Sequence, residues 1–185
     1  GRDPEGVRVG AVQVYPRPPE IRHGCVTAQV LDRGLACVRI EDPAGRYPIF
    51  DATGSTIAPG RWNNIGSPMI YASEHYSTAL LEKLVHGSGR LPPNQHYITI
   101  TIPRGLTYEM FSPVSLPEWD RMPATTSKMF GEKWCLEKRS VILIVPSVVA
   151  RLDRNVLINP AHPEFPHITT SLHEAVFWDR RLFGM

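Results

Sequence analysis

The sequence has few of the features that would place it in a specialised class of protein. Its three cysteines are an odd number without CxxC spacing, which argues against a disulfide framework and fits small, buried, reduced thiols in a cytosol (Cys25, Cys37 and Cys135). No apolar run approaches the roughly 18 residues of a transmembrane helix, and no signal peptide is visible. The net charge is only +2, and no run of Lys or Arg exceeds two residues. We therefore expect a cytoplasmic protein that contacts neither a membrane nor, directly, a nucleic acid.

The composition that remains is ordinary for a globular protein, with 42% hydrophobic and 21% charged residues. A chain of 185 residues can bury about 70% of its unfolded surface, so it needs neither a metal nor a disulfide to fold. Residues 1–24 are rich in Pro, Gly and Arg. Within them, residues 7–14 alternate loosely, as an edge strand would, and PRPPE at 16–20 reads as a loop.

Several later stretches have the patterns of β-strands. Residues 95–102 alternate with period two, which directs Ile98, Ile100 and Ile102 to the core. The run SVILIV at 140–145 is apolar throughout and predicts a central strand buried on both faces. Residues 26–31 and 35–40 flank a short turn-forming segment, DRG, and predict a hairpin. Shorter strands are expected near 106–111, 155–158 and 167–172.

A helix is predicted over residues 125–138, although Gly131 weakens that prediction. Its expected core contacts are Met129, Trp134, Cys135 and Leu136. Trp119, just before it, is expected to be a packing residue. The whole pattern favours a single α+β domain, in which a mixed, twisted sheet is flanked by a few helices.

Residue types suited to chemistry concentrate between Pro59 and Gly87, where a turn, a short strand and a helix are expected in succession. Gly and Pro force a tight loop that presents Arg61, whose planar guanidinium suits phosphate or carboxylate oxygens. The strand delivers Tyr71 to its end, and Ser73 is expected to cap the helix that follows.

That helix has two candidate faces. Tyr76, Leu80 and Leu84, with Leu81 and Val85 beside them, form a broad apolar stripe. A second row at the same spacing contains Thr78, Glu82 and His86, so Glu82 and His86 project the same way. From spacing alone, this row is either a solvated face or part of a functional site.

Ser147 follows the predicted central strand, where a hydroxyl either lines a pocket or forms a simple turn. Four residues suggest a metal site, but the prolines of HPEFPH prevent ligands from sharing a helix face, so we expect no metal (His162, Glu164, His167 and His173). No Gly-rich loop follows a strand, which disfavours a Rossmann dehydrogenase.

Several of these stretches, in order, resemble the RES domain family. They are CVRIEDPAGRYPIFDATGS at 37–55, GRWN at 60–63, SPMIYASE at 67–74, ALLEKLVH at 79–86, LPEWD at 116–120, GEKWCLEKRSVILIVPS at 131–147, NVLINPAHPEF at 155–165 and FWDRRL at 177–182. One departure is Pro59, where the family often has Gly. The resemblance implies a RES domain over residues 37–185, preceded by an N-terminal arm over 1–36.

The resemblance also implies an ADP-ribosyltransferase-like fold that acts on NAD⁺. Arg61, Glu82 and Ser147 match the family's named Arg, Glu and Ser, and Tyr71 and His86 match further positions. Glu82 would stabilise an oxocarbenium-like ribose as the nicotinamide–ribose bond breaks. Arg61 would bind the pyrophosphate or the attacking phosphate. Tyr71 would stack its ring on nicotinamide and orient the ribose with its hydroxyl. Ser147 would hydrogen-bond the nicotinamide ribose or amide, and His86 would complete the pocket or orient Glu82.

Bacterial toxins of RES–Xre toxin–antitoxin systems carry this domain, so the resemblance implies a toxin that depletes NAD⁺ and an Xre-like antitoxin partner. No cofactor is implied: NAD⁺ is the substrate, and inorganic phosphate is a candidate second substrate. One alternative is a protein ADP-ribosyltransferase, and another is a non-catalytic interaction domain. A purely structural alternative is a buried ion pair between Arg61 and Glu82. Arg39 falls where the family has an Arg, although a pairing role is the plainer interpretation.

Overall fold

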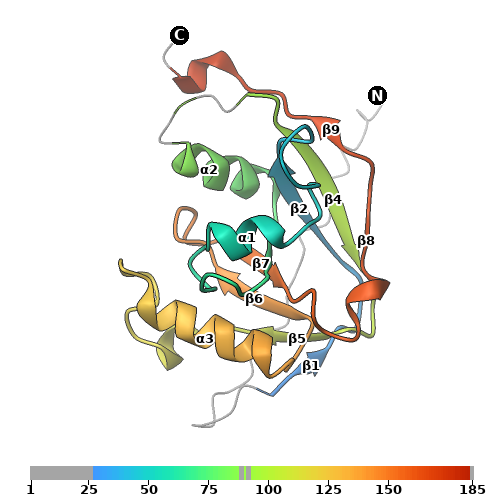
Figure 1. Ribbon diagram of the computed structural model, residues 1–185, viewed down its shortest axis with the longest axis vertical. Helices are drawn as coiled ribbons and strands as arrows, with labels where there is room; N and C mark the ends of the chain where they lie inside the picture. Colours follow the sequence, from blue (N-terminus) through green and yellow to red (C-terminus); the bar gives the residue numbers. More distant parts are fainter. Residues whose placement is uncertain (1–26, 88–89, 91–92, 184–185) are drawn as a thin grey trace, which may run out of the picture.

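A nine-stranded mixed sheet forms the centre of the computed structural model, which describes residues 27–87, 90 and 93–183 (Figure 1). The strands follow the order β1 (Gln29–Val30), β5 (Thr107–Met110), β6 (Ile142–Pro146), β7 (Arg154–Ile158), β3 (Ile70–Ser73), β2 (Leu35–Glu41), β4 (His96–Ile102) and β8 (Thr169–Thr170), and β9 (Glu174–Ala175) also pairs with β4. Among the strands of the described residues, only β5 and β6 run parallel to each other. The predicted α+β class with a mixed sheet is therefore confirmed.

The sheet divides between β2 and β3, which share a single paired position, Val38↔Ser73. By contrast, β2 pairs with β4 along its whole length, and β3 pairs with β7 along its whole length. The larger core cluster contains side chains from both halves, including Cys37 and Ile100 from one and Ile142 and Ile158 from the other. The two halves thus meet at the β2–β3 junction and share one core.

Three α-helices accompany the sheet: α1 (Thr53–Ile57), α2 (Tyr76–His86) and α3 (Thr125–Leu136). In Figure 1, α2 lies near β2 and α3 near β5 and β6, with α1 between the two helices. Short 3₁₀ turns occur at η1 (Pro113–Ser115), η2 (Phe165–His167) and η3 (Arg180–Phe183). No helix in the described ranges is long and apolar enough to cross a membrane.

Gly131 lies within the continuous helix α3 and is required there by packing. A Cβ atom at this position would lie 2.1 Å from the main-chain oxygen of Trp62, so only glycine lets the helix approach the loop that carries Arg61. Trp134 and Cys135 are buried as predicted. Met129 and Leu136 are 67% and 73% exposed, so their predicted core contacts are wrong. They lie on the solvent side of a helix whose packed side is centred on Gly131 and Trp134.

Two strand predictions are confirmed in detail. Ile98, Ile100 and Ile102 are buried on β4, and every residue from Val141 to Val145 is buried around β6, which lies between two neighbouring strands. Trp119 is also buried, in the smaller core cluster. Period-two alternation and a continuous apolar run therefore predicted correctly which faces of β4 and β6 are buried.

The predicted hairpin is wrong, because β1 pairs with β5 and β2 pairs with β3 and β4. The segment between β1 and β2 instead carries the chain from one edge of the sheet to its other half. The turn residues indicated correctly that the chain bends, but bending does not determine which strand becomes the neighbour.

The predicted faces of α2 are partly reversed. Thr78 and Ala79 are its buried residues, whereas Leu81 and Val85 are 45% and 58% exposed. The predicted cap is also wrong: Ser73 ends β3, and His75 is the N-cap residue without a side-chain hydrogen bond. The faces differ because Thr78 and Glu82 of the polar row have polar partners on β7 and after β6. Ser73 does not cap the helix because it pairs with Asn155 across the sheet.

Two predictions fall in the N-terminal part of the chain. The loosely alternating strand at 7–14 and Cys25 lie outside the described residues. Cys37 and Cys135 are free and buried, as expected for reduced thiols, and burial raises the pKa of both, to about 12 for Cys37. The boundary between an arm and a domain at residues 36 and 37 stays a prediction.

Candidate active site

The carboxylate of Glu82 lies at the meeting point of three elements. Ser147 Oγ, just past β6, donates to Glu82 Oε1 at 2.9 Å, and Asn155 Nδ2 on β7 donates to the same oxygen at 2.6 Å. Glu82 itself is half-buried on α2. The fold thus brings together two of the predicted residues, Glu82 and Ser147, which lie 65 positions apart in the chain.

The helix that carries Glu82 is anchored on both sides. The hydroxyl of Thr78, one turn before Glu82, donates to the carboxylate of Asp153 in the β6–β7 loop, and Lys83 forms an ion pair with Glu41 on β2. Ser147 is fixed too, because its amide donates to Asp153 O at 3.0 Å. These contacts determine where the Glu82 side chain points.

Asn155 is the residue of this cluster that sequence reasoning missed. It pairs with Ser73 across β3 and β7, and the Ser73 hydroxyl donates to Asn155 Oδ1 at 2.8 Å. Asparagine is depleted in strands, so a strand asparagine before a buried apolar run is a signal that could have found it.

The loop carrying Arg61 is organised around the buried side chain of Asn63. Its Oδ1 accepts hydrogen bonds from Gly60 N and Tyr71 Oη, each at 2.8 Å. Its Nδ2 donates to the main-chain oxygens of Ser55 and Ser67, also at 2.8 Å. A Cβ at position 60 would meet the Tyr71 ring at 2.5 Å, so the loop is fitted closely to that ring.

Arg61 points its guanidinium toward a main-chain segment before α3. Its NH1 donates to the carbonyl oxygens of Trp119 at 3.3 Å and Arg121 at 3.0 Å, and its NH2 lies 3.6 Å from Met122 Sδ. Arg61 forms no ion pair with Glu82, both of which the structure describes, so the structural alternative of an Arg61–Glu82 pair is not supported.

Tyr71 is bound to the Arg61 loop through its hydroxyl. This group accepts a hydrogen bond from Trp62 N at 3.0 Å and donates to Asn63 Oδ1 at 2.8 Å. Burial raises the pKa of Tyr71 despite the hydrogen bond from Trp62 and the nearby charge of Arg61, so the phenol stays protonated. The hydroxyl holds the loop, and its expected contact with a ribose stays a prediction.

His86 lies at the exposed end of α2. Its Nδ1 is 2.6 Å from the main-chain oxygen of Glu82, one turn earlier, whereas the hydrogen bonds to the Glu82 carboxylate come from Ser147 and Asn155. The expectation that it orients that carboxylate directly stays a prediction without a contact here.

Arg39 spans the junction of the two half-sheets. Its Nε donates to Ile49 O at 2.7 Å and its NH1 to Tyr71 O at 2.8 Å, while NH2 pairs with Glu41 at 3.2 Å. Burial lowers the pKa of Arg39, and the neighbouring carboxylates of Glu41 and Asp51 oppose that effect. Its pairing role is therefore observed, and it links β2 to the strand that carries Tyr71.

The residues that suggested a metal make other contacts, among them a hydrogen bond from Glu164 N to His162 Nδ1 at 3.2 Å. Glu164 accepts hydrogen bonds from the amide and hydroxyl of Thr107, and His173 Nδ1 lies 2.9 Å from His96 Nδ1. Within the part of the chain that the structure covers, no three His, Cys, Asp or Glu side chains gather as metal ligands would.

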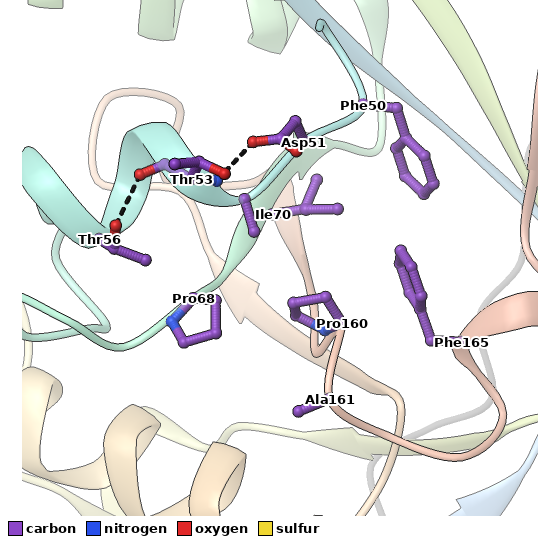
Figure 2. Close-up of a pocket in the computed structure, with 10 residues that line it drawn as sticks. Phe50, Asp51, Thr53, Thr56, Pro68, Ile70, Pro160, Ala161 and Phe165 are labelled. Carbon is purple, nitrogen blue, oxygen red and sulfur yellow. Dashed lines mark hydrogen bonds between the residues drawn. The ribbon is translucent and has the colours of Figure 1, made fainter. Parts of the chain in front are cut away.

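A separate cavity of about 380 Å³ opens beside α1 (Figure 2). The rings of Phe50 and Phe165 stack at one side of it, with centroids 5.5 Å apart. Its other lining residues are Asp51, Ala52, Thr53, Thr56, Pro68, Ile70, Pro160 and Ala161. Neither Glu82 nor Ser147 lines this cavity, so it is not the site built around them.

The RES domain model matches residues 36–179, which include every residue of the Glu82 cluster and the Arg61 loop. The chain belongs to the RES domain family. This confirms the family that the sequence motifs indicated.

Curated relatives within this family carry toxin names. The chain is 36% identical over 151 residues to the "Prs ADP-ribosylating toxin" of Sphingobium sp. (strain YBL2), covering 78% of this chain and 94% of that protein. It is 33% identical over 119 residues to "Toxin Res" of Photorhabdus laumondii subsp. laumondii, covering 63% of this chain and 76% of that protein.

The fold resembles that of a chain in the crystal structure of the M. tuberculosis MbcT–MbcA toxin–antitoxin complex. The TM-score is 0.62 at 12% identity, over 80% of this chain and 86% of that one. At that identity the likeness concerns the fold, and it agrees with the RES assignment made from the sequence.

Proposed function

We propose that this RES domain is a toxin that cleaves the nicotinamide–ribose bond of NAD⁺. The observation that carries the proposal is the Glu82 carboxylate, held by Ser147 and Asn155 in a family whose curated relatives are named as toxins. One of those names states ADP-ribosylation, a reaction for which NAD⁺ is the usual donor.

The chemistry requires an anion near the anomeric carbon. When the bond from that carbon to nicotinamide breaks, nicotinamide leaves with the electron pair as a neutral molecule, and positive charge develops on the ribose. A carboxylate fixed beside that charge stabilises the transition state by typically a few kcal/mol. Water or inorganic phosphate then captures the ribosyl cation, and the proton released goes to solvent.

The remaining predicted residues take binding roles in this proposal. Arg61 binds the pyrophosphate or the attacking phosphate, exchanging its bonds to the carbonyls of Trp119 and Arg121 for phosphate oxygens. Tyr71 presents its ring to nicotinamide and keeps the Arg61 loop in place. Ser147 hydrogen-bonds the ribose beside Glu82, and His86 forms one end of the substrate pocket.

One observation favours a protein side chain as an alternative acceptor of ADP-ribose. The relative that is 36% identical is named as an ADP-ribosylating toxin, which fits transfer of ADP-ribose to a protein side chain. The bond cleaved and the role of Glu82 are the same in both reactions. Only the nucleophile that captures the ribosyl group differs.

A toxin of this kind requires control in its own cell. The structural likeness to a toxin–antitoxin complex supports a cognate antitoxin, and we expect an Xre-like protein that covers the site in the cytoplasm. No cofactor is needed in this proposal, because NAD⁺ is consumed as a substrate.

The test is NAD⁺ turnover by the purified chain, with and without inorganic phosphate, beside the variant Glu82→Gln. This change removes the negative charge while keeping the shape, so we expect turnover to fall at least about 100-fold. Glu137→Gln, at an exposed carboxylate after α3, is the matched control and is expected to match the parent. Stimulation by phosphate would identify a phosphorylase.

One outcome would contradict the proposed bond cleavage, and another would change only the acceptor of ADP-ribose. Stable NAD⁺ in a folded parent protein would exclude NAD⁺ cleavage under these conditions. Label from NAD⁺ that appears on a protein, without free ADP-ribose, would replace NAD⁺ depletion by protein ADP-ribosylation. A folded parent that neither turns over NAD⁺ nor labels a protein would favour the non-catalytic interaction domain.

A further inference from the structure

The hydrogen bonds to Glu82 are unevenly distributed over its two oxygens. Ser147 Oγ and Asn155 Nδ2 both donate to Oε1. Among the described residues, none donates to Oε2. One oxygen is therefore held by the protein, and the other is left for a ligand.

The groups that hold Glu82 are neutral. A hydroxyl and an amide stabilise the ionised carboxylate without cancelling its charge, whereas Lys or Arg would cancel it. The nearest cationic side chain along the helix, Lys83, pairs with Glu41 instead. In the described part of the chain Glu82 takes part in no ion pair, so its charge remains available to a cationic group.

The amide of Asn155 has a fixed orientation. The Ser73 hydroxyl donates to Asn155 Oδ1 at 2.8 Å, which leaves Nδ2 to face Glu82. A flipped amide would place its oxygen against the Glu82 carboxylate, which has no hydrogen to donate to it. Ser73 is 3% exposed, so water cannot readily replace its hydrogen bond.

The backbone beneath this pair is rigid. Asn155 pairs with Ser73 on one side and with Val145 on the other, so β7 is flanked by strands at this position. Side chains on interior strands hold a catalytic group more accurately than side chains on loops do.

From these contacts we propose that Asn155, oriented by Ser73, is a positioning residue that holds Glu82 Oε1 and directs Oε2 at the substrate's developing positive charge. The inference rests on the proposed function of the Glu82 site. It adds two residues that act through Glu82 and do not themselves touch the reacting bond.

The kinetic test uses Asn155→Asp and Ser73→Ala. Asn155→Asp is nearly isosteric but puts an oxygen where Nδ2 donated, so the carboxylate is repelled from its position. We expect kcat for NAD⁺ to fall about 10- to 100-fold, with KM nearly unchanged, since misplacement of a catalytic group affects mainly the transition state. Ser73→Ala removes the hydrogen bond to Asn155 Oδ1, so the amide is held less rigidly, and we expect a smaller loss in the same parameter.

Asn94→Asp is the matched control, because Asn94 Nδ2 also donates to a carboxylate, that of Asp42 at 2.6 Å, away from Glu82. We expect it to leave kcat unchanged. Parental kcat in a folded Asn155→Asp variant would overturn the proposal. Should that variant fail to fold, Ser73→Ala decides: parental kcat overturns the orienting role, and a reduced kcat supports it.

A second measurement does not depend on turnover. In protein labelled with ¹³C at glutamate carboxyls, Glu82→Gln identifies the Glu82 signal, and we expect that signal to shift in Asn155→Asp and in Ser73→Ala. An unshifted signal in both variants would overturn the proposal even if the parent consumes NAD⁺. A shifted signal in a protein that leaves NAD⁺ intact would support the positioning and refute the proposed function separately.

Discussion

At the scale of single residues, the candidate site depends on hydrogen bonds that join distant segments of the chain, such as that from Ser147 to Glu82. Glu82 and Ser147 were predicted to share a site, and their side chains are hydrogen-bonded. Tyr71 was predicted to offer its hydroxyl to a substrate, but that hydroxyl is engaged by Trp62 and Asn63 of the Arg61 loop. Residue type limits the chemistry that a side chain can perform, whereas its partner depends on contacts between distant segments.

The phenol of Tyr71 leads to a prediction for stability. Tyr71→Phe removes the acceptor for Trp62 N and one donor to Asn63 Oδ1, and both of these partner residues are buried. We expect the free energy of unfolding to fall by about 1–3 kcal/mol, the usual cost of unpaired buried polar groups. Urea denaturation measures it.

Tyr47→Phe is the control for that experiment, since Tyr47 is half-buried and its contact is a stacked Arg46. We expect a change within about 0.5 kcal/mol, as for surface substitutions elsewhere. If Tyr71→Phe and Tyr47→Phe lower the free energy of unfolding equally, the Tyr71 hydroxyl does not hold the Arg61 loop in place.

At the scale of elements, local patterns predicted strands and helices well and their partners poorly. The alternation over residues 95–102 and the apolar run at 140–145 reflect directly which side chains are buried. Both segments form the predicted strands, as β4 and β6. The hairpin between 26–31 and 35–40 failed because a turn is encoded locally and strand pairing is not. The face of α2 was misjudged because hydrogen bonds from Thr78 and to Glu82 orient the helix, and an apolar stripe does not reveal them.

The packing of α3 against the Arg61 loop gives an element-scale prediction. Gly131→Ala places a Cβ atom 2.1 Å from Trp62 O, and either the helix or the loop must move. We expect a loss of stability of about 1–3 kcal/mol, as in other overpacked sites, despite the better helix propensity of alanine. Thermal unfolding reports it, and NAD⁺ turnover should fall as the loop shifts.

Gly54→Ala is the matched control within α1. The nearest atom to its added Cβ would be on the Tyr47 ring at 3.9 Å, an ordinary contact. Without a clash the helix propensity dominates, so we expect stability to rise by up to about 1 kcal/mol. A stabilised Gly131→Ala variant would show that the helix and the loop can separate without cost.

At the scale of the whole molecule, two half-sheets meet at the single Val38↔Ser73 pair, and the candidate site lies beside that junction. Asn155 from β7 and Ser73 from β3 belong to the Glu82 cluster, and Arg39 links β2 of the other half to β3 through the main-chain oxygen of Tyr71. This convergence depends on the order of strands in the sheet, which explains why the Ser73–Asn155 contact was not predictable from spacing along the chain.

The sheet order also predicts how protection from hydrogen exchange is distributed. Amides of β6 and β7 belong to interior strands with buried side chains, whereas β8 and β9 are two-residue strands with exposed side chains. We expect the interior amides to exchange only through global unfolding and those of β8 and β9 to exchange much faster, measured by mass spectrometry. Equal protection across the sheet would contradict this order.

The hydrogen bonds of the Asn63 side-chain amide predict how often loss-of-function mutations arise at position 63. Its oxygen accepts two hydrogen bonds and its nitrogen donates to main-chain oxygens on both sides of the loop. Aspartate lacks the donors, glutamine is one methylene too long, and serine or alanine leaves most of the bonds unmade. In a selection that rewards loss of function, position 63 should therefore yield escape mutants as often as Glu82 does, although Asn63 performs no chemistry itself.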